Sequence, residues 1–193
     1  MIPKPLVFAI TVLLASVLGL GVYLRHLAHK AKQAPSGAAD TRPVMPPSAG
    51  PETPAILYLA NDDQGTLRRE ETTVAMPADA PKRAREILRT LVLRYQEQGS
   101  AHPLGAGADI DEVYLVGANL AVVDVNGNFA DHHRSGILVE DLTLASMART
   151  LAANLPGITS MKLLVDGRER ATLAGHADLL EPFSVSAAER LVK

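Results

Sequence analysis

The chain has 193 residues and a formal net charge of −2 at neutral pH, with 19 basic and 21 acidic side chains. It contains no cysteine, which excludes disulfides, thiolate metal sites and thiol nucleophiles together. From residue 54 onward, 14 basic and 19 acidic residues are spread along the chain, and this mildly acidic balance argues against a nucleic-acid partner.

The most hydrophobic segment is an uncharged run of 19 residues whose ends are Leu6 and Leu24. As a helix it would reach about 28 Å, close to the ~30 Å hydrocarbon thickness of a bilayer. Backbone amides in lipid must bond within their own segment, so we predict one transmembrane helix. A cleaved secretory signal is the alternative, but the run is long for that class and no A-x-A step follows it.

The charges that flank this run leave its orientation undecided. Lys4 and the amino terminus precede it, whereas Arg25, Lys30 and Lys32 follow it. Basic flanks tend to stay cytoplasmic, which would place the C-terminal part in the cytoplasm. The difference is only about one charge, so this rule alone does not choose the side.

The predicted organisation is a tail (1–5), the span (6–24), a linker (25–53), one folded domain (54–185) and a C-terminal tail (186–193). The linker is basic at its start and then rich in proline and alanine, which predicts a semi-extended spacer. The 169 residues beyond the span are enough for one domain with a proper core.

The domain begins with two predicted strands, 56–59 and 67–76, separated by a turn at 61–65. A helix follows, with Asp79 placed as its cap and Pro81 in its first turn. Its apolar residues recur at helical spacing and predict one buried stripe: Ala84, Ile87, Leu88, Leu91, Val92 and Tyr95.

A glycine-containing loop (99–108) precedes two further predicted strands, 113–116 and 120–125, which form a hairpin. A second helix is predicted from about 138 to 154, with Glu140 in its first turn and a buried face of Leu144, Met147, Ala148, Leu151 and Leu155. The segments 161–165 and 170–174, joined by Asp166-Gly167, predict a last hairpin. The predicted fold is α+β, a small mixed or antiparallel sheet with two packed helices.

The order of these landmarks resembles a known family. Its motifs, in chain order, are Val113-Tyr114-Leu115-Val116, Ala121-Val122-Val123-Asp124-Val125-Asn126, Glu140 opening a helix with Arg149-Thr150-Leu151, Met161-Lys162-Leu163-Leu164-Val165-Asp166-Gly167, Thr172-Leu173-Ala174-Gly175-His176-Ala177-Asp178, and Pro182-Phe183. Together they resemble the GerMN domain of sporulation and spore-germination proteins over roughly residues 55–185.

The resemblance implies a compact α+β fold, similar to the ring-building motifs of envelope assemblies, displayed outside the cytoplasmic membrane. It implies no catalytic residues. Two features depart from the family pattern. The chain has no lipobox cysteine and carries the predicted span instead, and it holds one copy of the domain where some members hold two.

Two groups of histidines are the candidate sites. His132 and His133, beside Asp131 and with Glu140 further on, are the best metal candidate, but adjacent histidines point in different directions, so we expect them to be solvated. His176 is a conceivable general base with a nearby carboxylate, although a structural bond to a backbone carbonyl fits its position better.

The remaining polar motifs predict no site. Ser135, Ser146 and Ser160 lack the glycine-flanked elbow of a nucleophile, and the Gly105-x-Gly107 pair lacks the residues of a phosphate loop. The basic face of the first helix could bind anionic lipid, but a solvated face is the simpler interpretation: Lys82, Arg83, Arg85, Arg89 and Arg94. We therefore predict no catalytic, cofactor-binding or metal-binding residue.

The sequence favours a single-pass protein of the bacterial cytoplasmic membrane whose extracytoplasmic domain is a non-enzymatic interaction or scaffold module. The expected partner is an envelope protein or a second copy of the chain, paired through strand edges, with no small-molecule substrate identified. One alternative is an envelope enzyme acting on cell-wall or lipid material through His132, His133 or His176. A transmembrane sensor is disfavoured because only five residues precede Leu6.

Overall fold

The computed structural model describes residues 50–192. The predicted tail, the predicted span from Leu6 to Leu24 and nearly all of the predicted linker lie outside the described residues. None of the helices within the described part has both the length and the apolar character needed to cross a bilayer.

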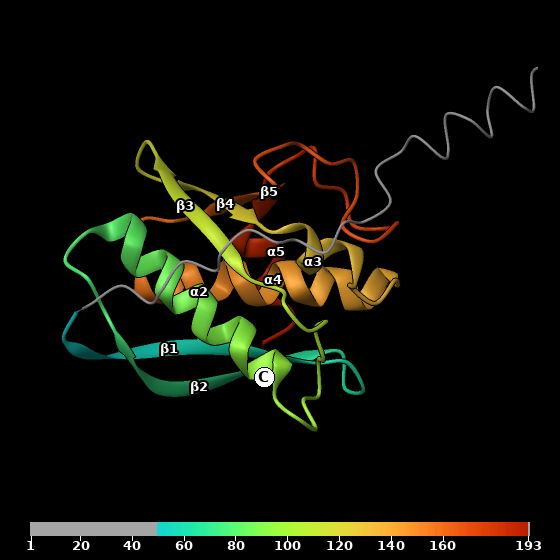
Figure 1. Cartoon of the computed structure of the whole chain (residues 1–193), viewed down its shortest axis with the longest axis horizontal. Helices are drawn as coiled ribbons and strands as arrows, with labels where there is room; N and C mark the ends of the chain where they lie inside the picture. Colours follow the sequence, from blue (N-terminus) through green and yellow to red (C-terminus); the bar gives the residue numbers. More distant parts are fainter. Residues whose placement is uncertain (1–49, 193) are drawn as a thin grey trace, which may run out of the picture. The chain divides into compact units, whose positions relative to one another are not determined.

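Two sheets enclose the long helices (Figure 1). The first is an antiparallel hairpin of β1 (Glu52–Asn61) and β2 (Thr66–Ala75). The second has the order β3-β4-β5-β6, formed by β3 (Ile110–Val116), β4 (Leu120–Val125), β5 (Ser160–Val165) and β6 (Phe183–Ser184). The β3–β4 and β5–β6 pairs are antiparallel and β4–β5 is parallel. The predicted α+β class is confirmed, with two sheets rather than one.

The two long helices are α2 (Ala80–Gln96) and α4 (Ile137–Asn154), and the short ones are α3 (Gly127–Asp131) and α5 (Val185–Glu189). Asp79 caps α2 by accepting the Lys82 N–H at 3.1 Å, as its position predicts. The apolar stripes predicted for both long helices are buried and form the core together with one face of the second sheet.

The free edge of β1 is closed by side chains of α4 instead of by another strand. Asn154 accepts the Ile56 N–H at 2.9 Å through Oδ1 and donates to the Ile56 carbonyl at 2.7 Å through Nδ2. Thr150 Oγ1 accepts the Tyr58 N–H at 3.0 Å, and Ser146 Oγ donates to the Tyr58 carbonyl at 2.7 Å. The buried polar backbone of this edge is thus satisfied by a helix.

The hairpin predicted after Val165 is wrong beyond its turn. Asp166 and Gly167 do form a tight turn with φ of 54° and 71°, and Val165 bridges to Arg168. The chain then leaves the sheet, so 170–174 is not a strand, and β6 takes the neighbouring edge of β5. The physical reason is that the backbone N–H groups of residues 174, 176 and 177 bond to the Glu140 side chain and not to β5.

The residues predicted as a C-terminal tail pack on the domain. Ala188 of α5 is fully buried, and the Leu67 N–H donates to the Leu191 carbonyl at 2.7 Å. The folded part therefore extends past the predicted boundary at 185, and β1 begins at Glu52, two residues before the predicted start.

Candidate functional site

Glu140 is the most strongly anchored polar side chain among the candidates, and its exposed fraction is 0%. Its Oε2 accepts the N–H groups of Ala174, His176 and Ala177 at 3.0, 3.0 and 2.9 Å, and its Oε1 accepts the Gly136 N–H at 3.1 Å. Burial alone would raise the pKa of Glu140, but these bonds outweigh it and lower the pKa to about 2. The ionised carboxylate holds the 174–177 loop to the start of α4.

His176 bonds to this carboxylate and not to the expected backbone carbonyl, so that prediction is wrong. Its Nδ1 lies 2.9 Å from Glu140 Oε1 and 3.3 Å from Ser135 Oγ. A hydroxyl–imidazole–carboxylate relay needs the hydroxyl and the carboxylate on opposite ring nitrogens. Here both approach the same nitrogen, so Ser135, His176 and Glu140 lie together without forming that relay.

His132 and His133 do point in different directions, as predicted. His132 is exposed and follows the end of α3, whereas His133 is buried, so the expected solvation is wrong for His133. His133 Nδ1 donates to the Arg134 carbonyl at 2.7 Å, and its Nε2 lies 2.7 Å from Thr143 Oγ1. Among residues 50–192 no three His, Asp or Glu side chains are grouped as metal ligands would be.

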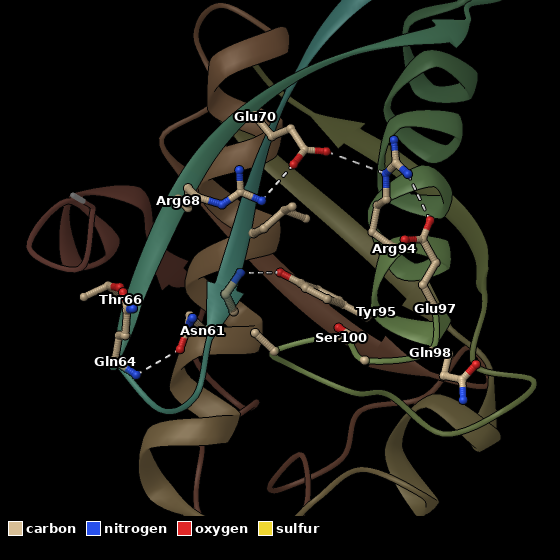
Figure 2. Close-up of a pocket in the computed structure, with 14 residues that line it drawn as sticks. Asn61, Gln64, Thr66, Arg68, Glu70, Arg94, Tyr95, Glu97, Gln98 and Ser100 are labelled. Carbon is tan, nitrogen blue, oxygen red and sulfur yellow. Dashed lines mark hydrogen bonds and ion pairs between the residues drawn. The ribbon is translucent and has the colours of Figure 1, made fainter.

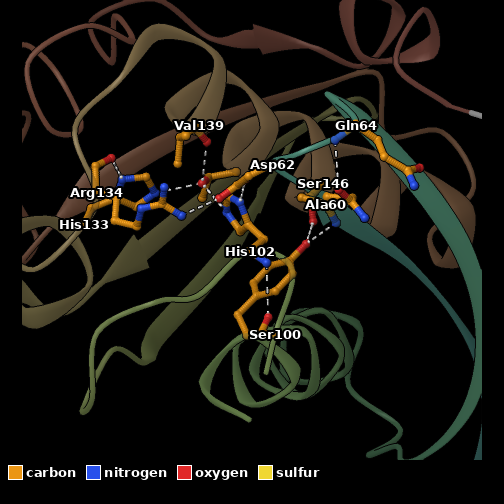
Figure 3. A network of polar contacts seen from close by, with 12 residues as sticks. Ala60, Asp62, Gln64, Ser100, His102, His133, Arg134, Val139 and Ser146 are labelled. Carbon is orange, nitrogen blue, oxygen red and sulfur yellow. Dashed lines mark hydrogen bonds and ion pairs between the residues drawn. The ribbon is translucent and has the colours of Figure 1, made fainter. Parts of the chain in front are cut away.

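His133 belongs to a buried network that the sequence does not reveal (Figure 3). His102 contacts Asp62 Oδ1 through Nδ1 at 2.5 Å and Thr143 Oγ1 through Nε2 at 2.8 Å. Thr143 also donates to the Val139 carbonyl at 3.0 Å. The network joins the β1–β2 turn, the 99–108 loop and α4. Asp62 and His102 are 40 positions apart in the sequence, and His102 and Thr143 are 41 positions apart.

The protonation of the two histidines is limited by burial and by the number of protons available. Desolvation lowers the pKa of both His102 and His133, so both rings are neutral near pH 7. With both rings neutral, each Nδ1 donates its one proton, His102 to Asp62 and His133 to the Arg134 carbonyl, so both Nε2 atoms are acceptors. The single Thr143 hydroxyl proton then lies within reach of three acceptors, the Val139 carbonyl and the two Nε2 atoms. Three protons thus serve five close contacts, and Thr143 is the shared centre of this structural tie.

The other predicted polar groups also serve the fold. Ser146 is fully buried and contacts the Tyr95 hydroxyl at 2.5 Å, while Ser160 donates to the Asn119 carbonyl at 3.4 Å. Gly105 packs closely against His132: a Cβ atom at position 105 would lie only 2.5 Å from the His132 Cβ. Close packing thus explains this glycine without a phosphate.

The predicted solvated basic face of α2 is wrong in part. Arg85 is only 3% exposed and lies 3.5 Å from Glu86, and Arg89 Nε pairs with Asp109 Oδ1 at 2.9 Å. Arg94 points away from these residues into a pocket. The arginines of α2 therefore do not form one continuous cationic surface.

That pocket has a volume of about 470 Å³ and lies between the β1–β2 hairpin and the C-terminal end of α2 (Figure 2). One wall is a ladder of alternating charges: Arg68 Nη2 to Glu70 Oε2 at 2.9 Å, Arg94 Nε to Glu70 Oε1 at 3.8 Å, and Arg94 Nη1 to Glu97 Oε1 at 2.9 Å. Local sequence patterns do not predict this pocket, because its walls come from segments about 25 residues apart. The doubled Arg-Arg-Glu-Glu of β2 is the one signal that could have drawn attention to it.

Tyr95 forms part of the pocket floor without being available for chemistry. Its hydroxyl accepts the Ala60 N–H at 2.8 Å and contacts Ser146. Burial raises the pKa of the Tyr95 hydroxyl, so it keeps its proton at any physiological pH. Tyr95 shapes the floor and fixes the end of β1.

These features define a class: a small mixed α+β domain whose buried polar clusters tie loops and strand edges to its helices. The family model described as "Sporulation and spore germination" (Germane) matches residues 56–171, more than half of the chain. The chain belongs to this family. No match was found among curated protein sequences.

The solved structures to which the chain is similar are distant in sequence. The tandem GerMN domains of the sporulation protein GerM from Bacillus subtilis match with 17% identity and a TM-score of 0.50, covering 69% of this chain and 46% of that one. The first GerMN domain of the same protein matches with 19% identity and a TM-score of 0.47, covering 67% and 94%. A lipoprotein candidate from Clostridium perfringens matches with 18% identity and a TM-score of 0.49, covering 77% and 97%.

Proposed function

We propose that this protein is a membrane-anchored, non-enzymatic interaction module that binds another protein at the outer face of the bacterial cytoplasmic membrane. The family membership and the uncharged run from Leu6 to Leu24 support the envelope location. The role of the polar clusters supports the non-enzymatic part, because Glu140, His133 and Ser146 each hold backbone or neighbouring side chains in the core.

The observation that carries the proposal is an apolar patch on the outer face of the second sheet. Tyr114 and Val116 of β3 are 52% and 51% exposed, and they pair across the sheet with Val122 and Leu120 of β4. The alternate residues of both strands face the helices and are buried or partly buried, so the β3–β4 hairpin is apolar on its inner face and carries four adjacent apolar side chains on its outer face. Charged residues border these four: the Glu112–Asp124 pair along the hairpin, and Lys162 of β5, which pairs with Val122. A clustered apolar outer face of this kind is a typical protein contact surface.

Photo-crosslinking in intact cells tests the surface with the full chain. p-Benzoylphenylalanine at Tyr114 should yield a discrete crosslinked protein band after irradiation. The matched control is the same residue at Ile137, which is 68% exposed but lies at the start of α4. Equal crosslinking at both positions, or none at Tyr114, would remove the support for this surface.

A second experiment tests on which side of the membrane the domain lies. The chain contains no cysteine, so a single introduced cysteine can be labelled selectively. Ala118→Cys places the only thiol at the exposed tip of the β3–β4 hairpin. A membrane-impermeant maleimide should label it in intact cells with a permeabilised outer layer. Labelling only after lysis would place the domain in the cytoplasm and contradict the proposed location.

A further inference from the structure

We propose that the pocket between β2 and the end of α2 binds a neutral, hydroxyl-rich ligand, a saccharide that bears acetamido groups. This site lies apart from the apolar patch and goes beyond the proposed protein contact. Its volume of about 470 Å³ falls in the ~300–1,000 Å³ range of small-molecule sites.

The charge ladder selects against ions and in favour of hydroxyl groups. Arg68, Glu70, Arg94 and Glu97 alternate in sign and sum to zero, so a bound anion would lie beside two carboxylates and a bound cation beside two guanidinium groups. A hydroxyl group donates one hydrogen bond and accepts others. It can therefore donate to Glu70 and accept from Arg94 at once, which neither a fully deprotonated anion nor an ammonium or metal cation can do.

The rim and floor of the pocket match the rest of such a ligand. Asn61, Gln64 and Gln98 bring side-chain amides to the rim, where an acetamido group can be matched donor to acceptor (Figure 2). Leu59, which is partly buried, supplies apolar lining for the C–H face of a sugar ring, and Tyr95 supports the floor from below with only 3% of its surface exposed. The pocket thus offers both hydrogen-bonding directions around an apolar floor.

The sequence of β2 supplies a matched control for this proposal. Successive side chains of a strand point to opposite faces, so the Arg68–Glu70 pair lines this pocket and the Arg69–Glu71 pair, at 2.8 Å, lines the other face. Arg68, Arg69 and Glu71 are exposed and Glu70 is partly buried, so each pair has at least one exposed partner and contributes little to stability. Arg68→Met/Glu70→Gln and Arg69→Met/Glu71→Gln are therefore expected to melt within a few degrees of each other and to differ mainly at the pocket.

The experiment is a titration of the detergent-solubilised full chain with N,N′,N″-triacetylchitotriose, followed by calorimetry or by NMR shifts. We expect binding with a Kd of about 1 mM or tighter that weakens about tenfold in the Arg68/Glu70 variant and stays within about twofold in the Arg69/Glu71 variant. Because the ligand is neutral, the affinity should be the same at about 50 and about 500 mM NaCl.

Two further sugars, the deacetylated trimer and the N-acetylglucosamine monomer, test the charge and the length of the ligand. The deacetylated, cationic chitotriose should bind at least about tenfold more weakly. A trimer that binds more tightly than N-acetylglucosamine indicates a glycan chain, and equal affinities indicate a single free sugar. Absence of binding by both neutral sugars, tighter binding of the cationic trimer, or equal loss in the two β2 variants would overturn the proposal.

Discussion

The sharpest test of the fold is the replacement of Glu140 by glutamine, which keeps the shape of the side chain and removes its charge. The carboxylate is fully buried and accepts four backbone N–H groups as well as facing His176 Nδ1. A glutamine turns one of the two oxygens into a donor, which then faces N–H groups that are also donors. At least one bond is therefore replaced by a repulsive contact.

The expected magnitude follows from the pKa of the carboxyl group. A fall from 4.5 in the unfolded chain to about 2 in the folded one corresponds to about 3 kcal/mol of stability at pH 7. Because the folded pKa is the lower one, this contribution is fully present above pH ~4.5 and is lost as the pH falls toward ~2. The Glu140→Gln variant lacks it at every pH.

Urea unfolding of the full chain, followed by circular dichroism between pH 7 and pH 3, measures this difference. The variant should be about 3 kcal/mol less stable at pH 7, and the gap should narrow steadily below pH ~4.5. Asp141→Asn is the control, because Asp141 is the neighbouring, exposed carboxylate, and its removal should leave the acid dependence in place. A deficit below about 0.5 kcal/mol at pH 7, or a gap that does not change with pH, would refute the reasoning.

Three further predictions concern the buried polar ties. Thr143→Val should lower the free energy of unfolding by about 2 kcal/mol, because it removes the one hydroxyl that lies against the Nε2 atoms of both His102 and His133. Thr90→Val, which removes only an equivalent bond to its own helix, should cost less than about 1 kcal/mol, and equal losses would contradict the role of the network. Asn154→Ala should cost about 2–3 kcal/mol by opening the β1 edge and should raise amide exchange there; unchanged exchange would count against that edge. An imidazole NMR titration should give His102 and His133 pKa values below the ordinary 6.5, and a ring that titrates at or above that value would contradict the effect of burial.

Local signals predicted most of the secondary structure. Helix α2 followed from the Asp79 cap and an apolar stripe that lie within one stretch of 17 residues, and the β3–β4 hairpin followed from two apolar runs around a short turn. In each case the residues that signal the element are close in sequence. Such elements are therefore visible without knowledge of the tertiary structure.

The wrong hairpin shows where local signals stop. The Asp166-Gly167 turn formed as predicted, but the next segment is held by Glu140, more than 30 residues earlier in the chain. The pairing of Asp62 with His102 and the pocket walls have the same origin, since each joins segments that no periodic pattern connects. Glu140 did give a hint, because the pattern placed this carboxylate in the first turn of the second helix, on a motif shared with the family.

The treatment of strand edges limits where a partner can bind. The β1 edge is closed by Asn154 and Thr150 of α4, so a partner strand would have to displace side chains that satisfy the backbone. The β2 edge bonds to Leu191 at one end and carries arginines and glutamates on both faces further along, and such charges disfavour strand addition. Neither edge of the first sheet is therefore suited to strand addition, and its main candidate binding feature is the pocket beside β2. Protein contact is therefore expected at the second sheet, where Tyr114 and Val116 are exposed directly opposite the apolar Val122 and Leu120 of β4.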